Sequence, residues 1–172
     1  SQARGRVISS WVASHIHRMQ QICDAAIANG RKVVVTGRSM IQNTDIARRL
    51  GYLNIPDEDI VDAYDLKGIP PEQVVIMCTG SQGEPLSALA RIANGEHKTI
   101  DLEQGDTVII SATPVPGNEK AVTRVINSLA KIGADVYDKK RAMVHVSGHA
   151  GAEELKLVLS IVQPNAFMPV HG

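Results

Sequence analysis

The sequence predicts an α/β fold in which a mainly parallel sheet carries helices on both faces. Short apolar runs typical of buried strands recur along the chain, and most are followed by a polar turn and a segment with helical periodicity. No clear β-hairpin signal joins neighbouring runs, which favours parallel pairing. The strands are expected at Lys32–Thr36, Ile60–Asp62, Val74–Cys78, Thr107–Ser111, Asp135–Tyr137, Val144–Val146 and Ala166–Val170.

The helices are expected between these strands, and glycines end several of them. Residues 1–6 have no periodic pattern and are interpreted as a linker or the remnant of an upstream strand. From Val7 to Asn29 the apolar side chains recur at helical spacing, and Gly30 stops that helix. Pro85 suits the first turn of a later helix. The helices are predicted over about Val7–Asn29, Gln42–Leu50, Leu86–Asn94, 119–132 and 151–162.

Composition limits the class of protein. The 172 residues are about the length of one domain, residues 1–172, and can bury a real core. Lys plus Arg balances Asp plus Glu, 18 against 18, which disfavours a free-standing basic clamp for nucleic acid. Cys23 and Cys78 lie in apolar contexts and are predicted to be buried thiols of a reducing, cytoplasmic compartment. No signal peptide opens the chain and no apolar run approaches the ~20 residues of a membrane span.

The stretch Val144–Ala150 carries the strongest candidate chemistry. Its apolar run ends in Ser147-Gly148-His149, and a helix with two acidic residues in its first turn is expected to follow. Backbone N–H groups at such a turn suit a phosphate or a carboxylate, and a histidine can exchange a proton near neutral pH. A second run ends in His171. If both runs are parallel strands, both histidines project from one edge of the sheet, where open α/β sheets carry their sites.

Four polar turns are expected to share that edge, and together with Arg38 and the histidines they favour an anion site. Each is rich in Gly, Ser, Thr or Asn, which present N–H and hydroxyl donors. Several better-known motifs are excluded: the turn around Ser81 lacks the Gly-Lys-Ser/Thr of a P-loop, and His15 and His17 face apart on a helix. His145 is interpreted as structural and His97 as part of a surface turn. The four turns are Gly37–Met40, Thr79–Pro85, Thr113–Glu119 and Ser147–Ala150.

The motifs of these turns resemble a known family. Taken in order and spacing, they are similar to the β-CASP domain of bacterial ribonuclease J, and the resemblance covers nearly the whole chain. It implies a Rossmann-like or flavodoxin-like β-CASP fold, inserted into a metallo-β-lactamase domain that holds two zinc ions. The motifs are Ala13–Arg18, Gly37–Met40, Thr79–Pro85, Pro116–Glu119, His145–Ala150 and Pro169–Gly172.

The resemblance also implies a function and roles for individual residues. RNA is cut in the cleft between the two domains, by endonuclease and 5′-to-3′ exonuclease action. By this resemblance His149 is catalytic and faces the scissile phosphate, and His171 is a zinc ligand. The expected phosphate- or RNA-binding residues are Ser147, Gly148, His149, Ala150, Arg38 and Ser81. The implied partners are RNA, the metallo-β-lactamase domain of the same chain and further copies in a homo-oligomer, with no membrane.

One departure from the family pattern limits what this chain is expected to do alone. The zinc signature His-x-His-x-Asp-His is absent from these residues. The chain is therefore expected to be a domain of a larger enzyme and to lack nuclease turnover by itself. Two alternatives stay open on the residues: a non-catalytic phosphate- or nucleotide-binding regulatory module of doubly wound fold, and a dimerisation or scaffold domain.

Overall fold

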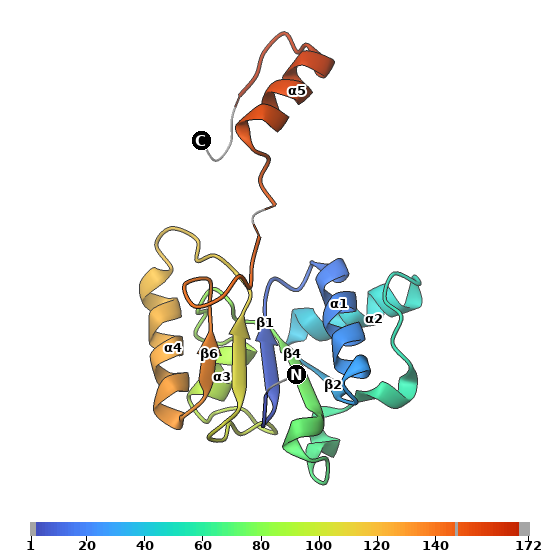
Figure 1. The fold of residues 1–172 in the computed structure, drawn as a ribbon, viewed down its shortest axis with the longest axis vertical. Helices are drawn as coiled ribbons and strands as arrows, with labels where there is room; N and C mark the ends of the chain where they lie inside the picture. Colours follow the sequence, from blue (N-terminus) through green and yellow to red (C-terminus); the bar gives the residue numbers. More distant parts are fainter. Residues whose placement is uncertain (1–2, 147, 169–172) are drawn as a thin grey trace.

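The computed structural model describes residues 3–146 and 148–168 and is built on a six-stranded sheet (Figure 1). Every pair of neighbouring strands is parallel, and the strand order is β3-β2-β4-β1-β5-β6. The predicted α/β class with a parallel sheet is confirmed. The strands are β1 Val7–Ser10, β2 Lys32–Thr36, β3 Ile60–Val61, β4 Val74–Cys78, β5 Thr107–Ile110 and β6 Asp135–Tyr137.

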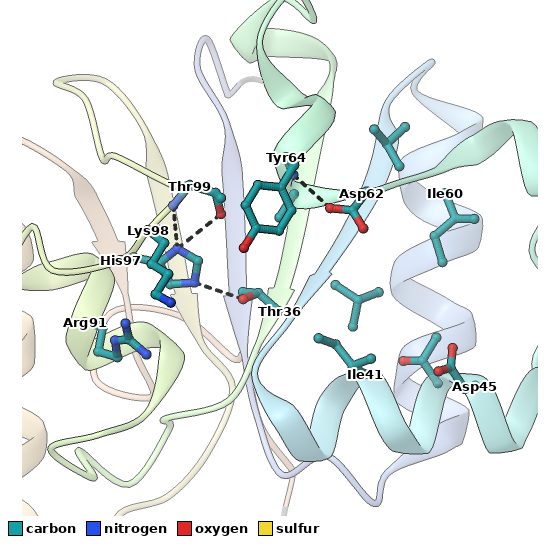
Figure 2. A pocket seen from close by; sticks show the side chains of 14 residues that line it. Thr36, Ile41, Asp45, Ile60, Asp62, Tyr64, Arg91, His97, Lys98 and Thr99 are labelled. Atoms are coloured by element: carbon teal, nitrogen blue, oxygen red, sulfur yellow. Dashed lines mark hydrogen bonds between the residues drawn. The ribbon is translucent and has the colours of Figure 1, made fainter.

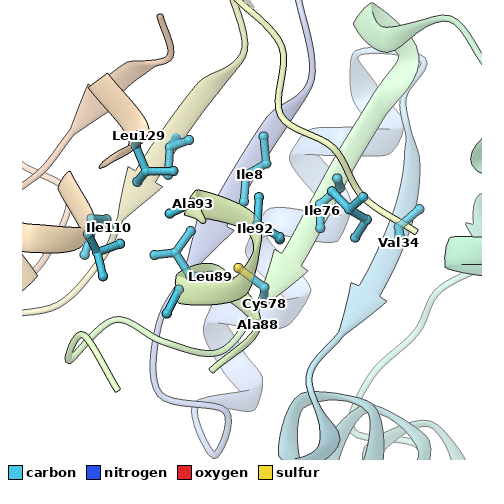
Figure 3. Close-up of a cluster of buried hydrophobic side chains, with 14 of the residues drawn as sticks. Ile8, Val34, Ile76, Cys78, Ala88, Leu89, Ile92, Ala93, Ile110 and Leu129 are labelled. Carbon is cyan, nitrogen blue, oxygen red and sulfur yellow. The ribbon is translucent and has the colours of Figure 1, made fainter. Parts of the chain in front are cut away.

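Helices cover both faces of the sheet, and each face has its own apolar core. Side chains alternate along the strands, so Val34 and Ile76 face one core while Val33 and Val75 face the other. The first core, drawn in Figure 3, packs against α3 and α4, and the second against α1 and α2. The α-helices are α1 Ile16–Ala28, α2 Arg38–Arg49, α3 Ala88–Ala93, α4 Glu119–Ile132 and α5 Ala152–Val162, and short 3-10 turns are η1 Asp57–Asp59, η2 Ala63–Leu66 and η3 Pro71–Gln73.

The central strand β1 was missed, because the sequence predicts a helix from Val7 onward. Val7–Ser10 pairs with β4 on one side and β5 on the other. Ser9 and Ser10 are buried there at 3% and 0% exposure. Because these two serines stand in β1, the strand lacks the continuous apolar run that a central parallel strand normally shows. The helix proper begins at Ile16, where the His15 ring accepts from the Arg18 N–H at 3.1 Å as an N-cap.

Helix α2 also begins earlier than predicted. The sequence assigns Gly37–Met40 to an exit turn and starts the helix at Gln42, whereas the structure starts it at Arg38. Gly37 adopts φ 94° directly after β2, and the chain turns into the helix within that one residue. A side chain at Gly37 would place its Cβ 2.5 Å from the Thr79 hydroxyl, which explains why glycine stands there. Arg38 therefore lies in the first helical turn.

The C-terminal part of the chain differs most from the prediction. Val144–Val146 is not a strand, and residues 166–168 are not one either, while the rest of the predicted last strand lies outside the described residues. Helix α5 forms as predicted, but it projects away from the sheet (Figure 1). None of its residues is buried. Without a neighbouring strand, the Val144 N–H donates to the Ala142 carbonyl at 2.8 Å and the Val144 carbonyl accepts from the Ser111 hydroxyl.

Both cysteines are buried thiols, as predicted. Burial raises the pKa of Cys23 to about 12, with Asp24 adding to the shift. Burial likewise raises the pKa of Cys78 to about 12. The raised pKa disfavours, in both thiols, the thiolate that metal binding or nucleophilic attack requires. Across the described residues, every helix is too short or too polar to cross a membrane.

Candidate functional site

The carboxyl edge of the sheet gathers the loops that the sequence singles out. Strands β1 and β2 lead into α1 and α2 on one face, whereas β4 and β5 lead into α3 and α4 on the other. In the sheet these strands alternate in the order β2-β4-β1-β5. Neighbouring loops therefore leave the edge in opposite directions, and crevices open between them, as at the switch point of a doubly wound sheet.

Gln82 ties two of the predicted loops together. Its side-chain amide donates to the Thr113 carbonyl at 3.1 Å and accepts from the Val115 N–H at 2.8 Å. Loops Thr79–Pro85 and Thr113–Glu119 thus form one polar wall. Ser81 in the first loop is only 3% exposed, so its hydroxyl does not present itself on this surface.

Arg38 lines a cavity of about 650 Å³ at the ends of β2 and β4. The N-cap residue of α2 is Gly37, which has no side chain to bond the first-turn N–H groups. These groups and the exposed Arg38 guanidinium give the cavity a positive character that suits an anion. Thr79 and Arg91 complete its polar lining. The sequence therefore predicted the position of Arg38 at this edge correctly, and its role stays a prediction.

A hydrogen-bonded cluster holds residues 144–145 against the end of β5. The Ser111 hydroxyl donates to the Val144 carbonyl. Arg18 donates to the Ser111 carbonyl at 2.8 Å and lies 3.5 Å from His145 Nδ1. Burial lowers the pKa of His145, and the positive charge of Arg18 lowers it further, followed by His15 and Lys139. His145 therefore contacts the Arg18 guanidinium from a segment that is not a strand, and its structural role stays a prediction.

The predicted phosphate loop lies beyond this cluster. Gly148, His149 and Ala150 are exposed and connect the sheet to the projecting helix α5, so they do not end a strand at the sheet edge as predicted (Figure 1). Ser147 and His171 lie outside the described residues. The structure therefore brings together three of the four expected loops, and the roles of Ser147, Gly148, His149, Ala150 and His171 stay predictions.

His97 is a candidate residue that the sequence did not single out. It is half-buried and lines a cavity of about 400 Å³ beside β2 and β3 (Figure 2). Its Nδ1 accepts from the N–H groups of Thr99 at 3.4 Å and Ile100 at 3.2 Å, and its Nε2 lies 2.9 Å from the Thr36 hydroxyl. Burial lowers the pKa of His97, as does Arg91, while Asp101 acts in the opposite sense. The sequence predicts a surface turn at this position because the charged residues Glu96 and Lys98 flank His97.

The lowered pKa of His97 predicts a stability that falls with acidity. The unfolded chain, with an ordinary histidine pKa of ~6.5, takes up the proton before the folded chain does. The free energy of unfolding therefore decreases as the pH falls from that value toward the folded pKa. Urea denaturation followed by fluorescence of Trp11, the one tryptophan, measures this at each pH. His97→Gln should weaken the dependence and leave the part that His145 contributes, because burial lowers the pKa of both histidines. The exposed His17→Gln is the comparison variant, and equal slopes in the two variants would contradict the assignment.

The described residues do not form a metal centre. Within 3–146 and 148–168, no three His, Cys, Asp or Glu side chains are arranged to hold a metal ion. Zinc requires three or four protein ligands. The donors present here do not fit a zinc ion, and any such site needs ligands from elsewhere.

Comparison with known proteins covers nearly the whole chain. A family model described as "Ribonuclease J, beta-CASP domain" matches residues 4–129, and one described as "Zn-dependent metallo-hydrolase RNA specificity domain" matches residues 133–172. "Ribonuclease J" of Mycolicibacterium smegmatis is 52% identical over 99% of the chain, and that of Mycobacterium tuberculosis is 50% identical over 99%. "Ribonuclease J 1" of Streptococcus pyogenes is 47% identical over 98%. The chain spans 30% of the length of each of these relatives.

Proposed function

The chain belongs to the ribonuclease J β-CASP family, and from that premise we propose that it forms the RNA-binding half of the active-site cleft of a ribonuclease. The observation that carries the proposal is the family match over residues 4–129, which include the polar loops at the carboxyl edge of the sheet. The regulatory-module and scaffold alternatives are not favoured by relatives that are named ribonucleases.

The proposed reaction is hydrolysis of phosphodiester bonds in RNA, by endonuclease and 5′-to-3′ exonuclease action. Arg38 and the first turn of α2 bind the RNA backbone at the carboxyl edge of the sheet, because both present positive charge to phosphates. Ser147, Gly148 and Ala150 hold the phosphate that is cut, and His149 faces it. Ser81 takes part only if its loop shifts, because its side chain is buried in the structure.

The metal belongs to the longer protein in this proposal. The description of the second family supports a metal, and two zinc ions with His171 as one ligand are the finer proposal. Since the described residues do not gather a metal site, the remaining ligands come from a metallo-β-lactamase domain of the same chain. The 172 residues then form one β-CASP domain of a larger enzyme that works as a homo-oligomer in the cytoplasm.

The exposed apolar surface of α5 supports a missing domain. Leu157, Ile161 and Val162 are 61%, 72% and 63% exposed, and Phe167 and Met168 after the helix are 58% and 83% exposed. Large apolar side chains exposed together on one short segment mark an interaction site. We place it against the metallo-β-lactamase domain, because the relatives continue well beyond the span of this chain.

The test compares the complete protein, meaning the full gene product that carries these residues, with the 172-residue chain. The zinc-loaded complete protein is expected to shorten a 5′-labelled RNA, whereas the chain alone produces no cleavage and retains no stoichiometric zinc after dialysis. Gel analysis of the products and metal analysis measure both. A complete protein that binds RNA tightly but never cuts it would contradict the nuclease and favour the regulatory module.

A further inference from the structure

Two cavities adjoin at the carboxyl edge, and together they are called the crevice. The cavity of about 650 Å³ at Arg38 and the cavity of about 400 Å³ at His97 share Thr36, Arg91 and His97 in their walls. The smaller cavity opens between α2, the end of β3 and the segment 97–99 (Figure 2). Its volume lies within the ~300–1,000 Å³ typical of ligand sites. The smaller cavity therefore offers space for one further chemical group beside a phosphate bound in the cavity of Arg38.

A hydrogen-bond relay presents a donor to this crevice. His97 Nδ1 faces the N–H groups of Thr99 and Ile100, so the ring proton is assigned to Nε2. The ring then donates to Thr36 Oγ1 across 2.9 Å. Thr36 thereby accepts one hydrogen bond and can donate its own hydroxyl proton to a ligand, although its side chain is 6% exposed.

Opposite charges line opposite walls of the smaller cavity. Arg91 and Lys98 stand on the wall that carries His97, while Asp45 on α2 and Asp62 after β3 stand across from them (Figure 2). The apolar side chains of Val35, Ile41 and Ile60 also line this cavity. This arrangement suits a ligand with a negative group at one end, hydroxyl donors at the other and an apolar face.

Tyr64 supplies an aromatic ring at the rim. The Asp62 carboxylate accepts from the Tyr64 N–H at 2.9 Å and so fixes the start of η2. The Tyr64 side chain is 72% exposed and its ring leans over the cavity toward Thr36 and His97 (Figure 2). An exposed, positioned aromatic ring is the usual platform on which an unpaired base stacks.

We propose that this crevice is a subsite for one nucleotide of the RNA substrate, with its phosphate at Arg38 and Arg91, its ribose hydroxyls at Asp45 and Asp62, and its base against Tyr64. The inference rests on the proposed function, because it names the part of the substrate that this edge holds. Carboxylates that accept from the 2′-hydroxyl make the subsite selective for RNA over DNA.

The first test is a pair of tyrosine variants in the complete protein. Tyr64→Ala is expected to raise the Kd for a single-stranded RNA oligonucleotide about tenfold, the loss of one stacked base. Tyr52→Ala is the matched control, since Tyr52 is 74% exposed and lines neither cavity. Its Kd should stay within about twofold of wild type. Trp11 fluorescence verifies that both variants keep the native fold.

The second test scans the sugar. Single 2′-deoxy substitutions are placed along the RNA, one position at a time. At one position the substitution is expected to raise the Kd of the wild type about tenfold and to leave the Kd of Asp45→Ala almost unchanged. The two effects differ because the 2′-hydroxyl and its carboxylate acceptor act as a pair. The subsite is refuted, and the proposed function stands, if the wild type binds and cuts RNA but two results are negative. These are an equal Kd for the two tyrosine variants and the absence of any RNA position where a 2′-deoxy substitution weakens binding by the wild type. A wild type that neither binds nor cuts RNA refutes both.

Discussion

Replacing His149 by alanine in the complete protein is expected to slow RNA cleavage by about 10²–10⁴-fold, with the melting temperature almost unchanged. In the proposed function this imidazole faces the scissile phosphate, where it stabilises the charge that develops on phosphate oxygens or protonates the leaving oxygen. Removing one such positioned group loses transition-state stabilisation without loss of packing. Single-turnover cleavage at saturating enzyme measures the chemical step directly.

His149 lies outside both apolar cores of the sheet. The residue is exposed, and the N-cap of α5 is Gly151, whose N–H donates to Glu154 at 2.6 Å. The N-cap position of α5, worth about 1 kcal/mol when a side chain fills it, is thus held by Gly151 and not by His149. Zinc content should stay normal in His149→Ala and fall in His171→Ala, the proposed ligand. Exposed His17→Ala on α1 is the neutral control. Cleavage by His149→Ala within a few-fold of wild type would remove the catalytic assignment.

The sheet was largely predictable because its strands carry β-branched apolar runs followed by glycine turns. Val74–Cys78 is the clearest, with every residue buried and boundaries as predicted. β1 was not predictable by the same signal, because Ser9 and Ser10 occupy its buried half and the following residues have helical spacing. Only pairing with β4 and β5 identifies Val7–Ser10 as the central strand, and that pairing is a tertiary effect.

The candidate site was predictable where it depends on topology. Parallel strands bring their carboxyl ends to one edge, so Arg38 and the loop of Gln82 could be placed from the order of elements alone. The crevice of His97 and Tyr64 could not, because its walls come from three segments whose approach depends on packing. The path of residues 144–146 and 148–150 also escaped prediction, since an alternating pattern indicates a strand only when a neighbouring strand is present to pair with it.

Gly83→Ala is expected to destabilise the chain by about 2–4 kcal/mol and to separate the two loops that Gln82 joins. Gly83 has φ +74°, where a side chain costs about 1 kcal/mol or more in backbone strain. A Cβ there would also lie 2.5 Å from the Ala121 carbonyl carbon and 2.6 Å from the Val122 nitrogen. Both contacts are with the backbone of α4, which cannot rotate away as a side chain can. The overlap adds about 1–3 kcal/mol.

Gly95→Ala separates the steric clash from the backbone strain. Gly95 has a similar φ of +69°, but a Cβ there meets nothing within 4 Å. Its substitution should therefore cost only the conformational part, about 1 kcal/mol. Urea denaturation followed by Trp11 fluorescence gives both free energies of unfolding, and RNA affinity of the complete protein should fall for Gly83→Ala more than for Gly95→Ala. Equal losses of stability in the two variants would mean that the 79–85 loop can move away from α4 without a cost in free energy. The close approach of the loop to α4 would then not be what fixes the wall that loops 79–85 and 113–119 form.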